Sequence, residues 1–131
     1  MKKLPYILAL LLFITACKKE NNAITFSGNY QGQQIIYSNH SLETHESEIN
    51  LSSPNFSVLK GIKKGSGTFA VTNKMEVVFT DTNVWTADFN WHILLNGSYK
   101  YEALGDSLIL TKYIGENKEN YYQYRLKRVD E

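Results

Sequence analysis

Histidine and carboxylate side chains, the usual protein ligands of zinc, crowd into one polar stretch of the chain. Two histidines and three glutamates fall within nine residues: His40, Glu43, His45, Glu46 and Glu48. A strand would point Glu46 and Glu48 to the same side, but nothing in the spacing orients His40 toward His45. The pattern therefore favours a solvated polar loop, and we predict that no metal binds there tightly.

Signatures of catalysis are sparse elsewhere in the chain. The single cysteine, Cys17, excludes a redox dithiol and an intrachain disulfide. The sequence has no Gly-x-Ser-x-Gly elbow and no Walker loop. His92 lies beside an apolar tryptophan, as a packed structural histidine does, and the acids Asp81, Asp88 and Asp106 are scattered over turns. We therefore predict a protein that is not an enzyme and that needs no cofactor.

Tyrosines are the strongest candidates for binding. Nine occur in the chain, and a buried tyrosine needs a partner for its hydroxyl. Five fall on the drier side of alternating segments: Tyr30, Tyr99, Tyr101, Tyr122 and Tyr124. They either line a pocket, with hydroxyls aimed at a small apolar or amphipathic ligand, or fill the interior of a small barrel. The sequence leaves both alternatives open.

The composition limits the classes of protein to consider. With 131 residues, 43% hydrophobic and 21% charged, the chain suits one folded domain and neither a disordered tail nor a polytopic membrane protein. The net charge of +1 gives no basic excess for nucleic acid. We expect a monomer whose partners are a membrane and a small hydrophobic ligand.

The amino-terminal segment has the composition of an export signal. Two lysines precede an apolar run over residues 4–14. That run is shorter than the roughly 20 residues needed to cross a bilayer, and it matches the hydrophobic region of a secretory signal. We therefore interpret residues 1–16 as a signal peptide that is removed.

The apolar run ends in Ile14-Thr15-Ala16-Cys17, which resembles a bacterial lipobox. The resemblance implies that Cys17 carries acyl chains such as palmitate and that residues 17–23 form a lipidated tether. Each buried acyl CH₂ contributes about 0.8 kcal/mol, so two or three chains would hold the protein on a bilayer. We expect a lipoprotein of the bacterial cell envelope at the outer membrane, on either its periplasmic or its surface face.

Residues 24–131 are expected to form one all-β domain, because period-2 alternation dominates there. Antiparallel strands with one dry face can hide that face by closing into an eight-stranded up-and-down barrel. A two-sheet β-sandwich is the alternative. Nine predicted segments, which we take as about eight strands, cover residues 24–31, 33–37, 46–52, 55–62, 67–72, 75–80, 98–103, 107–113 and 121–129. A packed connection is expected over 81–91, and a short strand or helical turn over 93–96.

The same alternation predicts which side chains meet inside the barrel. Parity places Arg128 on the inner side of the last strand and Arg125 in solvent. The expected interior comprises Phe26, Tyr30, Phe69, Phe79, Tyr99, Tyr101, Leu108, Leu110, Tyr122, Tyr124 and Leu126.

Two further patterns resemble small lipocalin-like, calycin-type bacterial lipoproteins. Gly28-Asn29-Tyr30 opens the first strand and a late arginine, Arg125 or Arg128, lies on the last one. The runs at residues 95–101 and 105–110 are similar to the ending of such proteins. The resemblance implies a barrel closed at one end by the arginine beside Tyr30, and by analogy a small-molecule ligand.

Two functions follow as alternatives. The first is a membrane-anchored lipoprotein that binds a small apolar or amphipathic ligand in its barrel; a cavity above about 300 Å³ at one barrel end would favour it. The second is a structural or protein-interaction lipoprotein that acts through its outer surface around a filled core. An exposed patch that includes Trp85 and Trp91 would favour the second.

Overall fold

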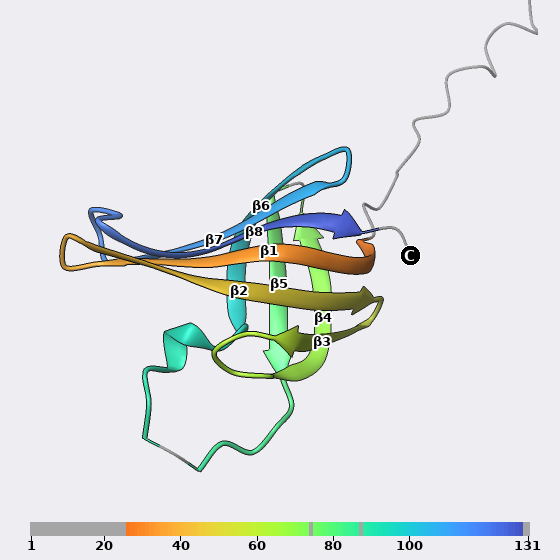
Figure 1. The fold of residues 1–131 in the computed structure, drawn as a ribbon, viewed down its shortest axis with the longest axis horizontal. Helices are drawn as coiled ribbons and strands as arrows, with labels where there is room; N and C mark the ends of the chain where they lie inside the picture. Colours follow the sequence, from red (N-terminus) through yellow and green to blue (C-terminus); the bar gives the residue numbers. More distant parts are fainter. Residues whose placement is uncertain (1–25, 74, 87, 130–131) are drawn as a thin grey trace, which may run out of the picture.

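Alternating apolar and polar residues close this chain into an antiparallel barrel (Figure 1). The structure is a computed structural model that describes residues 26–73, 75–86 and 88–129. Each strand pairs with the next and the last pairs with the first, so the up-and-down barrel is confirmed over the two-sheet alternative. The strands are β1 (Ser27–Ser38), β2 (Ser41–Ser52), β3 (Asn55–Lys60), β4 (Ser66–Asn73), β5 (Glu76–Asp81), β6 (Gly97–Leu104), β7 (Ser107–Ile114) and β8 (Asn120–Val129).

The proposed export and anchoring segments fall outside this description. The signal peptide (residues 1–16), Cys17 and the tether (residues 17–23) are not among the described residues. Within the part of the chain that is described, no helix is long and apolar enough to cross a membrane.

The interior is the one that parity predicts. All eleven side chains expected to point inward are buried. Six of their rings contact one another in a continuous series, in which Phe26 packs edge-on against Tyr101 at 5.1 Å and Phe79 packs edge-on against Tyr99 at 5.7 Å. Such ring pairs contribute about 0.5–1.5 kcal/mol beyond the area they bury. Ile49, Leu51, Phe56, Val58, Val77 and Leu95 complete the cluster.

The first strand differs from the prediction, because residues 24–31 and 33–37 do not form separate strands. β1 runs without a break through Gly32. A Cβ at Gly32 would lie 1.9 Å from the carbonyl oxygen of Arg125 on β8. The glycine therefore marks a close approach of two backbones inside a strand and not a turn.

The second strand begins earlier than predicted, because residues 41–45 belong to it and do not form a polar loop. β2 begins at Ser41, directly after a two-residue turn at Asn39 and His40. Its first residues are exposed on both sides, since the β1–β2 hairpin projects beyond the short strands β3–β5 (Figure 1). A strand segment whose two faces are both exposed to solvent has no alternation of apolar and polar residues, so the sequence pattern could not reveal it.

The remaining elements agree with the predictions to within about two residues at each boundary. The chain between β5 and β6 contains the 3₁₀ turn η3 (Trp91–Ile93), slightly earlier than the turn expected over 93–96. This connection leaves the barrel after Asp81 and returns to it at Leu94 and Leu95, which are buried in the interior.

Candidate functional site

The five candidate tyrosines all face the barrel interior, as parity predicted. Tyr99 and Tyr124 lie edge-to-face with their ring centroids 6.1 Å apart. Burial raises the pKa of both phenols well above the ordinary tyrosine value, so both rings are neutral hydrogen-bond donors. Tyr101 stands nearer the other end of β6, where its hydroxyl donates to the carbonyl oxygen of Asn73 at 3.3 Å.

One end of the barrel is closed by the segment that contains η3. The Gln34 amide on β1, itself 2% exposed, donates to the carbonyl oxygen of Ile93 at 3.0 Å. The hydroxyl of Tyr124 donates to the same oxygen at 3.5 Å, and that of Tyr99 donates to the carbonyl oxygen of Leu94 at 3.3 Å. The tyrosine hydroxyls in this region therefore bind the protein's own backbone.

Polar side chains extend this closure toward the mouth of the barrel. The Asn90 amide donates to the hydroxyl of Tyr122 at 2.7 Å, and the His92 ring packs on Tyr122 at 5.4 Å. From β7, the Lys112 ammonium donates to the carbonyl oxygen of Asn96 at 2.9 Å. Burial lowers the pKa of Lys112, and burial together with the Lys112 charge lowers the pKa of His92. Sequence reasoning found the tyrosines here but missed Gln34, Asn90 and Lys112.

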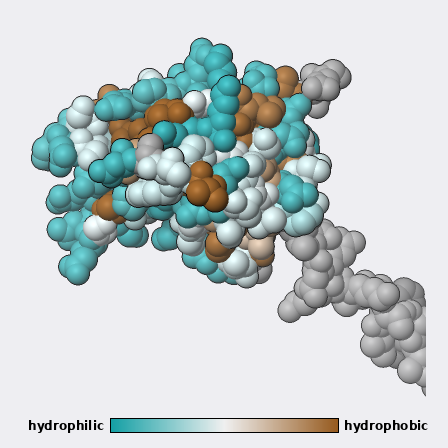
Figure 2. Space-filling view, turned by 90° about the horizontal axis from the view of Figure 1, so that it is seen from below, coloured by the Kyte–Doolittle hydropathy of each residue, from teal (hydrophilic) through white to brown (hydrophobic). Residues whose placement is uncertain are grey.

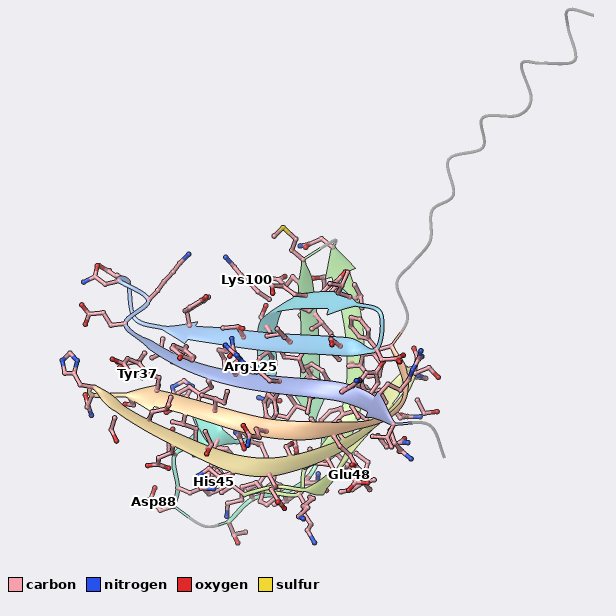
Figure 3. All side chains as sticks on the ribbon, turned by 45° about the horizontal axis from the view of Figure 1, so that its top comes forward. Tyr37, His45, Glu48, Asp88, Lys100 and Arg125 are labelled. Carbon is pink, nitrogen blue, oxygen red and sulfur yellow. The ribbon has the colours of Figure 1, made fainter. Side chains whose placement is uncertain are left out.

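The opposite end of the barrel carries an exposed arginine. Arg128 lies directly across from Tyr30 in the β1–β8 ladder, and it forms an ion pair with Asp106 at 2.8 Å. Its side chain also covers Gly28, where a Cβ would approach the Arg128 Cδ to 3.1 Å. Burial raises the pKa of Tyr30, and the Arg128 charge opposes that shift. Arg125 instead points outward, as expected (Figure 3).

Three hollows of the surface lie away from these five tyrosines. They are on the outside of β1 and β2, between the tips of the β1–β2 and β7–β8 hairpins, and beside β6 and β7. None of the three is lined by Tyr30, Tyr99, Tyr101, Tyr122 or Tyr124. The geometry of these side chains is that of a packed core.

A second group of aromatic residues lies outside the barrel, on the connection between β5 and β6. Trp85, Phe89 and Trp91 contact in sequence, with centroid distances of 5.8 and 4.4 Å. The Lys63 ammonium sits 4.3 Å from the centre of the Phe89 ring. The indole nitrogen of Trp85 donates to Asp81 at 2.9 Å. Lys63 thereby holds the connection against the β3–β4 loop. The apolar residues of the connection predict packing on the barrel, but most of its described residues are exposed.

Part of this connection remains exposed. The Trp91 side chain is 51% exposed and that of Val84 is 89% exposed. We define these two residues with Trp85 and Phe89 as the aromatic connection. Figure 2 views the molecule from below Figure 1 and shows separate hydrophobic patches set among hydrophilic side chains.

The histidine and glutamate group does not converge. His40 occupies the turn, whereas His45 lies on the inner side of β2, where its Nε2 is 3.2 Å from Glu43. Glu46 and Glu48 share the outer side, as expected for a strand, and Glu46 pairs with Lys60. Over residues 26–73, 75–86 and 88–129, no three His, Cys, Asp or Glu side chains are arranged to hold a metal ion.

Comparison with known proteins returns no match to a protein-family model, to a curated protein sequence or to a solved structure.

Proposed function

We propose that this protein is a non-enzymatic envelope lipoprotein that acts through its outer surface around a filled barrel core. The observation that carries the proposal is the contrast between a packed interior and the aromatic connection, which leaves Trp91 half exposed. Exposed tryptophan and phenylalanine are enriched where proteins bind one another. A protein surface that fits around these side chains is the partner that we propose.

The anchor is the second part of the proposal. Acylation of Cys17 and removal of residues 1–16 would leave the barrel on a short tether at the outer membrane. The Cys17→Ala variant should move from the membrane to the soluble fraction. Unchanged partition of that variant would contradict the proposal of a lipid anchor.

We also propose a lipocalin-like, calycin-type relationship for the barrel. Support comes from the contact that the sequence resemblance implied, in which a late arginine meets a Gly-x-aromatic pair. Arg128 lies over Gly28 and across from Tyr30 at one end of a closed eight-stranded barrel. The barrel is compatible with that fold.

Site-specific photo-crosslinking in cells tests the surface role. A photoreactive residue at position 91 or 84 should give a discrete crosslinked protein. The matched control is position 104, because Leu104 is 84% exposed on a different element, β6. Equal crosslinking from positions 91, 84 and 104 would indicate random contact and would contradict the proposal.

A small apolar ligand inside the barrel is the second candidate function. The observation that favours it is that one connecting segment, residues 90–96, closes the tyrosine-lined end through bonds of 3.0–3.5 Å. Opening of that segment would expose the hydroxyls of Tyr99, Tyr122 and Tyr124. Under either function we propose a monomer that does not bind nucleic acid.

A further inference from the structure

A hollow of about 420 Å³ lies between the tips of the two projecting hairpins. Its lining is one tyrosine ring, two amides, one imidazole and one carboxylate, from Tyr37, Asn39, His40, Asn120 and Glu119. The volume is within the range of about 300–1,000 Å³ typical of small-ligand sites. We call these five residues the tip hollow.

The two tips that form the hollow are joined by a hydrogen bond. The backbone amide of Asn39 donates to the side-chain oxygen of Asn120 at 3.2 Å, which links β1–β2 to β7–β8. Pairing continues up to the hollow, with Tyr37 directly opposite Tyr121. The bond and the pairing bring residues of both hairpins to one hollow.

The backbone at these tips adopts a conformation that favours glycine. Asn39 and His40 have φ values of 52° and 63°, and Lys118 in the other tip has 54°. A two-residue turn of this kind usually takes glycine at its second position. A histidine with positive φ at this position lowers stability, and strained backbone conformations of this kind cluster at functional sites.

Tyr37 belongs to a row of aromatic rings on the outer face of the sheet. It stacks on Tyr121 at 5.4 Å with an angle of 16° between the rings, and Tyr121 meets Tyr113 edge-on at 6.3 Å. Figure 3 shows Tyr37 toward the projecting end of the sheet, well away from Glu48. The row continues from the wall of the tip hollow across the outer face of β8 and β7.

The chemistry of the lining selects among ligand classes. A purely apolar ligand would take water from two amides, an imidazole and a carboxylate without replacing its hydrogen bonds. A phosphate or sulfate group would meet the Glu119 carboxylate. A neutral ring with apolar faces and many hydroxyls suits both the tyrosine face and the planar polar groups.

We propose that the tip hollow binds a neutral carbohydrate, with a sugar ring lying against Tyr37 and its hydroxyls bonded by Asn39, Asn120 and Glu119. The outer tyrosine row would carry further sugar units of the same chain. This site is separate from the aromatic connection, so it can fail or succeed independently of the proposed protein partner.

Titration of the soluble domain, residues 24–131, with neutral hexasaccharides tests the proposal, once its spectrum shows the folded barrel. We would add maltohexaose, cellohexaose and a mannan hexasaccharide and follow backbone amide resonances by NMR. At least one should shift the amides of residues 37–40 and 119–121 saturably. No shift with any of the three, or shifts confined to the aromatic connection, would overturn the proposal.

Variants separate recognition from folding. Tyr37→Ala should weaken binding by about tenfold or more, and Tyr37→Phe should keep most of it because the ring face remains. Glu119→Ala tests the hydroxyl contacts without removing a strand residue. Leu104→Ala, at an exposed site on β6, is the matched control and should bind as the unchanged protein does.

Charged and aromatic competitors test the other classes of ligand that the tip hollow could bind. Single-stranded oligothymidine and polygalacturonate offer stacking bases and acidic sugars, and both should bind more weakly than the best neutral hexasaccharide. Stronger binding of either polyanion at residues 37–40 would overturn the assignment to a neutral sugar.

Discussion

Two regions of the barrel interior are filled by different means. One region is packed with phenylalanine rings, where Phe56 and Phe69 both contact Phe79 at 5.2–5.7 Å. The other region is closed by polar side chains that bind the backbone of residues 90–96, Gln34 and Tyr99 among them. Apolar packing needs only the right side and volume, whereas a polar closure needs each donor to meet its acceptor.

That difference predicts unequal consequences for mutation. The phenylalanine region should set the global stability of the barrel. The polar closure should set how often one end opens, because a few bonds to a single segment can break while the strands stay paired.

Phe79→Ala should have the largest effect. Removing a ring that is 1% exposed and touches three others leaves a cavity in the core. The free energy of unfolding should fall by about 3–5 kcal/mol. Denaturant unfolding measures it, with Val78→Ala on the outer side of β5 as control. A loss no larger than that of the control would show that this region is not the packed one.

Gln34→Ala should have the next largest effect and should act mainly on the closure. The carbonyl oxygen of Ile93 loses its shortest side-chain donor, at a cost of about 1–3 kcal/mol. Hydrogen exchange of Leu94 and Leu95 should accelerate more than that of the strand cores. Gln33→Ala, an exposed neighbour on β1, is the control. Equal acceleration everywhere would mean that the closure and the barrel open as one unit.

The apolar region could be predicted from the sequence, whereas the polar closure could not. Parity correctly placed Phe79, Tyr99 and Tyr124 inside, because alternation records which face of a strand is buried. It could not identify Ile93 as the acceptor for Gln34, since the two are 59 residues apart and the contact depends on the path of an irregular segment.

The projecting hairpins were the least predictable region. Residues at the start of β2 are exposed on both faces, so residues 41–45 were interpreted as a loop. The tip hollow joins Asn39 to Asn120 across 81 residues and exists only once β8 has closed on β1. The sequence did contain a signal for the β1–β2 turn, because Asn39 and His40 are two turn-forming residues between segments that both become strands.

Alkaline pH should weaken the polar end. Burial raises the pKa of Tyr99 and Tyr124 above the ordinary value of about 10, so the unfolded chain releases these protons first. The contribution of the two tyrosines to the free energy of unfolding is constant below pH ~10. Above that pH it falls by up to about 1.4 kcal/mol per pH unit for each tyrosine.

Lys112 opposes this loss in part, since burial lowers its pKa and folding then favours its neutral form. Denaturant unfolding across alkaline pH, with tyrosinate absorbance read in parallel, measures the balance. Tyr124→Phe should flatten the decline. An unchanged slope in that variant would assign the effect to other groups.

His40→Gly should have the smallest effect and the opposite sign. Glycine adopts a φ of 63° without the cost that a Cβ brings, so the free energy of unfolding should rise by about 0.5–1 kcal/mol. Thermal unfolding measures the change, and Ser38→Gly, a strand residue next to the turn, should instead destabilise the hairpin. A loss of stability in His40→Gly would show that the imidazole supports the turn.

The filled interior is tested most directly by native mass spectrometry of the protein isolated from its host cells. We expect the mass of the polypeptide, with acyl groups if the proposed anchor is present, and no further small molecule held in the barrel. A stoichiometric, dissociable apolar ligand, lost when the interior is narrowed by Leu110→Phe in a variant that still folds, would contradict it. That result would make the tyrosine-lined interior the working site of the protein.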